Sequence, residues 1–89
     1  MNFQTLEFSD SFLESMLSKQ FSRREQLLFV KALRLLDTDD RHPSLRVHAL
    51  QGAEQGIWSA SASDDLRITF ERLPSGHKRL HLCSRHYQR

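Results

Sequence analysis

The side chains best suited to proton transfer and phosphate binding are concentrated in the second half of this 89-residue chain. All five histidines are there, at positions 42, 48, 77, 81 and 86. Residues 41–89 hold eight Lys/Arg against four Asp/Glu, a formal charge of +4, whereas residues 1–40 hold five against seven, a charge of −2. Imidazole titrates near neutral pH, and guanidinium holds phosphate through a fork of N–H donors. The pattern predicts a polyanion-binding surface with proton-transfer groups, and a solvated basic face is the alternative.

The composition indicates one globular domain over residues 1–89, with 38% hydrophobic and 27% charged residues. No apolar run approaches the roughly 18 residues that a membrane span needs. Residues 1–10 lack the basic and apolar regions of a secretory signal. The single cysteine, Cys83, has no internal disulfide partner. Together these features favour a cytoplasmic protein that does not engage a membrane.

The elements that must position the reactive side chains begin with a short strand and two helices. Residues 2–8 suit a strand, and a helix N-cap follows at residues 9–10, before apolar residues at helical spacing. Ser22 and Glu25 form a capping-box pattern that starts a second helix. That helix is expected to end near Asp37, before a polar stretch and a proline.

The second half changes to the period-two pattern of strands. Alternation runs through residues 45–50, a second strand is expected at 57–62, and the clearest one covers 66–71. A turn at 74–76 leads to the last strand, where Leu80 and Leu82 alternate with His81 and Cys83. The fold class is therefore α+β, in the order β-α-α-β-β-β, with two helices packed on one face of an antiparallel sheet. The opposite face remains for function.

Arg67 is expected on that opposite face. If Ile68 and Phe70 point toward the helices, strand alternation turns Arg67 away from them, where its guanidinium can hold a phosphate. The alternative is a solvated Arg67 that pairs with Glu71 or Asp65.

Two stretches of the second half resemble the RelE/ParE toxin superfamily, and most closely its YoeB branch. That branch has a glycine-aromatic-Trp-Ser segment, an acidic turn, an arginine in a short strand, and a C-terminal Cys-x-x-His-Tyr. The corresponding segments here are Gly56–Ser59, Asp64–Asp65, Leu66–Phe70 and Cys83–Tyr87. The segment His42–Val47 and the following Leu50–Gly52 resemble the leader to these strands in RelE-type proteins. The resemblance covers residues 42–87, and residues 1–41 agree only in their helix pattern.

The resemblance implies a set of catalytic residues. In the YoeB branch these are a glutamate base, the strand arginine and the terminal His-Tyr pair. The strand arginine matches Arg67, and the pair matches His86 and Tyr87. The glutamate position falls on His48, a departure from the branch, although some RelE-type relatives have a histidine before a similar stretch. The lysine-rich patch of RelE itself is absent, which argues against a lysine-based mechanism.

The implied reaction is cleavage of mRNA through its own 2′-hydroxyl. His48 is assigned as the base, Arg67 as the phosphate clamp and His86 as the acid, while Tyr87 stacks on a base or orients the phosphate. No metal or other cofactor is expected, because Arg67 supplies the charge stabilisation. Two arginines, Arg46 and Arg85, are assigned to binding the flanking RNA backbone. Four cations on the helices are expected to contact ribosomal RNA: Arg23, Arg24, Lys31 and Arg34.

The main interpretation is a ribosome-dependent endoribonuclease toxin whose partners are mRNA, the ribosome and a cognate antitoxin, as a homodimer or a toxin–antitoxin hetero-oligomer. One alternative is a ParE-like toxin that binds gyrase and does not cut RNA, and another is an inactive interaction module on the same fold. A metal site of His81, Cys83 and His86 is disfavoured, because alternation places His86 opposite the other two. Trp58 is expected to be a core residue rather than a ligand-stacking one.

Overall fold

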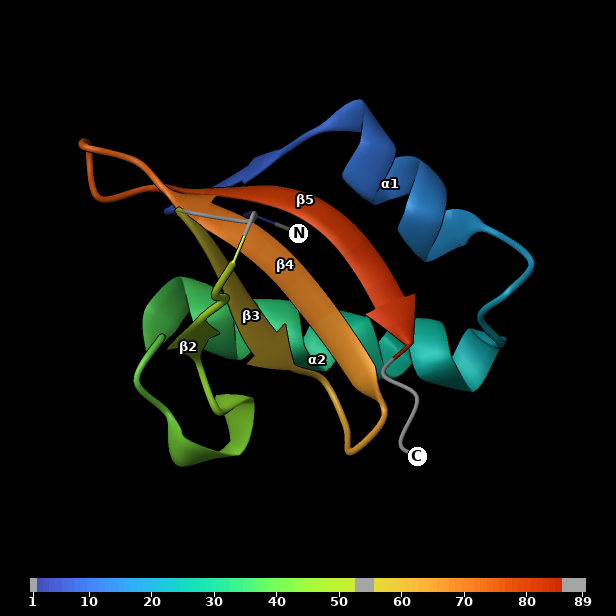
Figure 1. Cartoon of the computed structure of the whole chain (residues 1–89). Helices are drawn as coiled ribbons and strands as arrows, with labels where there is room; N and C mark the ends of the chain where they lie inside the picture. Colours follow the sequence, from blue (N-terminus) through green and yellow to red (C-terminus); the bar gives the residue numbers. More distant parts are fainter. Residues whose placement is uncertain (1, 53–55, 86–89) are drawn as a thin grey trace.

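The computed structural model describes residues 2–52 and 56–85, which form one layer of strands and one of helices (Figure 1). Along the chain the elements are β1 (Leu6–Phe8), α1 (Asp10–Leu17), α2 (Arg23–Thr38), the 3₁₀ turn η1 (Pro43–Leu45), β2 (His48–Ala49), β3 (Ile57–Ser61), β4 (Leu66–Arg72) and β5 (Lys78–Arg85). The strands are ordered β1-β5-β4-β3-β2. In Figure 1, α2 passes behind β3 and β4, and α1 lies beside β5. The expected α+β class, with two helices on a sheet, is confirmed.

Two features of the sheet differ from the sequence-based prediction. β1 runs parallel to β5, so the sheet is mostly rather than wholly antiparallel. The sheet also contains one strand more than the order β-α-α-β-β-β, because the described residues include β2. The alternation over residues 45–50 yields only a two-residue strand, since η1 precedes it and Arg46 adopts a left-handed backbone with φ 47°. Leu45 is buried by this turn rather than by a strand.

Both helices begin where their capping residues predict. The Ser9 side chain accepts a hydrogen bond from the backbone N–H of Phe12, and Ser22 and Glu25 form the full capping box. α2 ends at Thr38, one residue after the predicted end. Within the part of the chain that the structure describes, no helix has the length and apolarity to cross a bilayer.

The core lies between the helices and one face of the sheet. Phe12 of α1, Phe29 of α2 and Ile68 and Phe70 of β4 are all fully buried. The two β4 residues therefore point toward the helices, as expected. This packing fixes the alternation of β4 and turns Arg67 to the opposite face, which we call the open face.

A β-bulge changes the alternation of β5. The pairing with β4 shifts between Thr69 and Phe70, so that Thr69 pairs with Leu82 but Phe70 pairs with Leu80. An extra residue in one strand moves the following side chains to the other face. Leu82 is consequently 45% exposed, while Leu80 and Cys83 are buried. The prediction that Leu80 and Leu82 share a face is therefore wrong.

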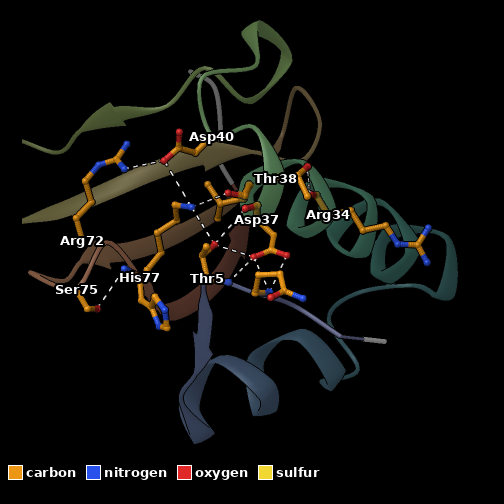
Figure 2. A network of polar contacts seen from close by, with 11 residues as sticks. Thr5, Arg34, Asp37, Thr38, Asp40, Arg72, Ser75 and His77 are labelled. Atoms are coloured by element: carbon orange, nitrogen blue, oxygen red, sulfur yellow. Dashed lines mark hydrogen bonds and ion pairs between the residues drawn. The ribbon is translucent and has the colours of Figure 1, made fainter.

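A polar network joins the end of α2 to the sheet (Figure 2). The Asp37 carboxylate accepts hydrogen bonds from the backbone N–H groups of Gln4 and Thr5 and from the Thr5 hydroxyl. The Lys78 ammonium, which is buried, donates to Thr5 Oγ1 at 3.1 Å and to the Leu36 carbonyl at 2.9 Å. These bonds hold β1, β5 and α2 together at one end of the molecule.

The same network reaches β4 through Asp40. Arg72 Nη1 donates to Asp40 Oδ2 at 2.9 Å, and Lys78 Nζ lies 3.6 Å from the same oxygen. The hydrogen bond from Arg72 leads the causes that hold the pKa of Asp40 below its usual value. In Asp37, burial raises the pKa, but the hydrogen bonds from residues 4 and 5 outweigh it and the pKa is lowered.

Candidate active site

The register of the sheet defines which residues share the open face. One row across it contains His48, Ser59, Thr69 and Leu82, because His48 pairs with Ser59, Ser59 with Thr69, and Thr69 with Leu82. The next row contains Ser61, Arg67 and Ser84. Directly paired residues point to the same face. The structure therefore brings two of the predicted catalytic residues, one on β2 and one on β4, onto a common surface.

Arg67 is half-buried and held by backbone oxygens. Its Nη1 donates to the Ser63 carbonyl at 2.7 Å and to the Leu66 carbonyl at 3.1 Å. Among residues 2–52 and 56–85, neither Glu71 nor Asp65 forms an ion pair with it, so the predicted alternative pairing is not found in that part of the chain. The contacts fix one end of the guanidinium, and Nε and Nη2 form no hydrogen bond with the described residues.

His48 is exposed at the edge strand β2, and its ring is oriented by its own chain. Nδ1 lies 2.8 Å from the Arg46 carbonyl. A carbonyl only accepts hydrogen bonds, so Nδ1 must carry the proton in this contact. The lone pair of the neutral ring is then on Nε2, which is the arrangement that a general base requires.

The two side chains are separated by one strand and two residues of register. With strands about 4.8 Å apart and a rise of about 3.4 Å per residue, the Cα atoms of His48 and Arg67 are about 12 Å apart. Long side chains on the same face can approach one nucleotide from two sides across this span. Arg46 is also exposed and is the C-cap of η1, two residues before His48, so it lies near the same end of the site.

Arg85, which the sequence assigned to RNA binding, is held by protein groups. Its guanidinium forms ion pairs with Glu25 at 2.7 Å and Asp65 at 3.2 Å, and it donates to the Gln20 carbonyl. It also lies over the Phe21 ring, 5.4 Å from the centroid. The hydrogen bond from Arg85 is the main reason that the pKa of Glu25 falls to about 2, and the same bond raises the pKa of Arg85. The contacts join the N-terminus of α2 to the end of β5, and an RNA-binding role for Arg85 stays a prediction.

The remaining predicted residues are not all placed at the open face. His86 and Tyr87 lie outside the described residues. Four helical cations, Arg23, Arg24, Lys31 and Arg34, are exposed on α2. That helix covers the buried face of the sheet, so the structure does not bring these cations together with Arg67 (Figure 1).

The bulge in β5 also separates the side chains of the disfavoured metal site. His81 lines the open face, whereas Cys83 is 2% exposed and buried in the core. The prediction that these two residues share a side is therefore wrong. Burial raises the pKa of the Cys83 thiol to about 12, so it is a poor metal ligand as well as a poor nucleophile. Among the residues that the structure describes, no three His, Cys, Asp or Glu side chains form a metal-binding group.

A shallow hollow of about 410 Å³ lies on the open face beside Thr69 and Leu82, in the row that also contains His48. The sequence pattern did not predict this hollow. Its lining is mainly apolar: Leu50, Ile57, Thr69, His81 and Leu82. The hollow could not be predicted because it depends on the bulge that turns Leu82 outward, and no residue pattern in the sequence marks that bulge.

The sequence matches no known family model and no curated protein, but the structure resembles solved toxin structures. The toxin in the Escherichia coli DinJ–YafQ toxin–antitoxin complex superposes with a TM-score of 0.72 at 16% identity, covering 94% of this chain and 93% of that one. The YoeB/ParE toxin from Agrobacterium tumefaciens gives 0.67 at 20% identity, with coverages of 94% and 100%. The YoeB dimer from Staphylococcus aureus gives 0.65 at 21%, with coverages of 97% and 100%.

These likenesses extend over almost the whole of each chain. The chain therefore has the fold of these YafQ and YoeB toxin structures, and the fold expected from the resemblance of residues 42–87 is confirmed.

Proposed function

We propose that this chain is a toxin of a toxin–antitoxin system that cuts mRNA on the ribosome as an endoribonuclease. The observation that carries the proposal is that two side chains share one face of a RelE-type fold: an arginine whose guanidinium is held at one end, and a histidine that is oriented through Nδ1. Both groups are what cleavage of a phosphodiester by an adjacent 2′-hydroxyl needs: a base for the hydroxyl proton and a cation for the charge on the phosphorane.

In this mechanism, Nε2 of His48 takes the proton from the 2′-hydroxyl, whose oxygen then attacks the neighbouring phosphorus. The remaining N–H donors of Arg67 bind the non-bridging phosphate oxygens, which gain negative charge. The bond to the 5′-oxygen breaks, and His86 protonates that leaving group. Tyr87 stacks on a base or orients the phosphate. The products are a 2′,3′-cyclic phosphate and a free 5′-hydroxyl.

The ribosome and an antitoxin are the proposed partners. A small open sheet face does not orient a flexible single strand by itself, and a ribosome-held codon removes that entropic cost. Arg23, Arg24 and Lys31 then contact ribosomal RNA from the helix side. YafQ was solved in complex with DinJ, and we propose that a cognate antitoxin with an acidic segment covers the basic half of this chain.

The proposal is tested by mapping cuts in a defined mRNA during translation with purified components. We expect His48→Gln to slow cleavage by about 10²–10⁴-fold, because it removes the base. Arg67→Lys keeps the charge but loses the fork and is expected to slow cleavage by about 10²–10³-fold. Lys19→Gln, an exposed change outside the site, serves as the control and should leave the rate unchanged.

Cleavage at the wild-type rate in both site variants contradicts the assignment of roles. Arrest of translation without cuts points instead to a toxin that acts by binding, such as a gyrase poison, and the absence of any effect points to an interaction module.

A further inference from the structure

A second concave site lies on the helix side of the sheet, between the segment that follows α2 and strands β3 and β4. We call it the Trp58 pocket; it has a volume of about 370 Å³, and its chemistry comes from Asp40, Arg41, His42, Arg46, Trp58 and Arg72. This volume is in the range of pockets that hold small ligands.

The charges of the Trp58 pocket favour an anion. Among the described residues that line it, Asp40 is the one carboxylate, and two cations already match it, since Arg72 Nη1 lies 2.9 Å and Lys78 Nζ 3.6 Å from the same oxygen (Figure 2). Arg41 and Arg46 are exposed and form no ion pair with any residue in the described ranges 2–52 and 56–85. Two arginines are thus available to a ligand, and a phosphate fits their N–H forks.

The ring of Trp58 narrows the class of anion to a nucleotide. The Arg72 guanidinium covers one face of this ring, 4.6 Å from its centroid, so the partly exposed guanidinium plane is the flat surface that a base meets there. Unstacked bases stack on arginine guanidinium planes as well as on aromatic rings. An acidic peptide gains from the arginines but has no group that uses the flat surface.

The pocket and the candidate active site lie on opposite faces of the sheet, because Trp58 pairs with Phe70, which points toward the helices. One loop at the β2 edge links them. The Arg46 side chain lines the pocket, while its carbonyl oxygen accepts the hydrogen bond from His48 Nδ1. The edge strand between them, β2, has only two residues. A strand of RNA that places one phosphate between His48 and Arg67 therefore reaches Trp58 by turning around this two-residue edge strand onto the other face of the sheet.

We propose that the Trp58 pocket binds one nucleotide that flanks the cut, with its base on the Trp58–Arg72 surface and its phosphate on Arg41 and Arg46. This inference rests on the proposed ribonuclease function for the identity of the RNA. It gives the toxin a contact outside the cleaved phosphodiester, and such a contact sets sequence preference.

The chain offers a direct probe, because Trp58 is its only tryptophan. A short single-stranded RNA with 2′-O-methyl groups cannot be cut, and titration of the intact protein with it should change Trp58 fluorescence saturably. The double variant Arg41→Gln with Arg46→Asn should weaken this binding at least about tenfold; asparagine tolerates the left-handed backbone at position 46. The dependence of log K on log salt should also become shallower by about 0.7 for each phosphate that the variant no longer neutralises. Arg79→Gln, on β5, is the matched control and should bind as the wild type does.

Binding that is unchanged in the double variant, or a fluorescence response to an acidic peptide and none to RNA, overturns the proposal. Circular dichroism and the thermal midpoint establish that the double variant is folded, and a second variant, Arg72→Gln, should weaken binding in the same direction.

Because the titration needs neither ribosomes nor cleavage, it separates the two proposals: RNA binding at Trp58 without cuts in mRNA refutes the nuclease alone. Cleavage with unchanged sequence preference in the double variant refutes the pocket alone.

Discussion

Replacement of Lys78 by methionine should destabilise the fold by about 2 kcal/mol, because it leaves a buried acceptor without a donor. Lys78 is 5% exposed and donates to the Leu36 carbonyl at 2.9 Å in a buried setting. Its other partners have replacements: Thr5 Oγ1 still binds Asp37 at 2.7 Å, and Asp40 still binds Arg72 at 2.9 Å. The cost is therefore that of one unsatisfied carbonyl, in the range of about 1–3 kcal/mol, rather than that of a broken buried ion pair.

Arg79→Met is the matched control on the next residue of β5. Arg79 is 49% exposed and its contacts to Glu7 and Glu71 are 3.6 and 3.7 Å long, so its loss should cost less than about 1 kcal/mol. In a domain of this size, about 2 kcal/mol corresponds to a thermal midpoint lower by about 8–16 °C, which circular dichroism measures directly. A Lys78→Met protein as stable as the wild type, or an Arg79→Met protein that loses as much, refutes the reasoning.

Three further outcomes follow from the structure. The pKa values of Asp37 and Asp40 lie below the unfolded value of 3.8, so the stability that they contribute is complete well above that pH and is lost as the pH falls from 3.8 through the lower folded values. Urea midpoints should therefore drop below about pH 4, and less steeply in Asp37→Asn. The buried Cys83 thiol, with its pKa raised to about 12, should not react with a disulfide reagent at about pH 8 until the protein is unfolded. Phe70→Ala should lower the free energy of unfolding by about 3–5 kcal/mol in denaturant titrations, because Phe70 is fully buried.

Each of these has a clear contrary result. Urea midpoints with the same pH dependence in Asp37→Asn and wild type place the acid sensitivity elsewhere. Rapid labelling of the native thiol shows that Cys83 is reachable. A cost below about 1 kcal/mol at Phe70 shows that the core there is not closely packed.

The parts of the fold that the sequence predicted depend on local physics. The capping box at Ser22 and Glu25 involves residues three apart, and the alternation of Ile68 and Phe70 reports burial within one strand. The same alternation placed Arg67 on the open face. Both features could be predicted because each depends only on residues that are close together in the sequence.

The parts that the sequence did not predict depend on contacts between distant segments. Arg85 meets Glu25 across 60 residues, and nothing local marks that pairing. The bulge opposite Thr69 and Phe70 leaves Leu82 exposed rather than buried, and no glycine or proline in β5 indicates that a bulge is present. Trp58 packs against the core, as expected, but it is only half-buried and also lines a pocket with the loop after α2, which the sequence did not predict.

The central claim is that this chain cuts mRNA through the 2′-hydroxyl with His86 as the acid, and a single primer-extension experiment tests it. The substrate is a defined mRNA, intact or with one 2′-deoxy nucleotide at the mapped cut site, offered with and without translating ribosomes to the wild type and to His86→Ala. The proposed mechanism predicts cuts only with ribosomes, the wild-type protein and the intact hydroxyl, and cleavage by His86→Ala that is slower by about 10²–10⁴-fold. Cuts that persist at the deoxy site, or at the wild-type rate in His86→Ala, contradict it.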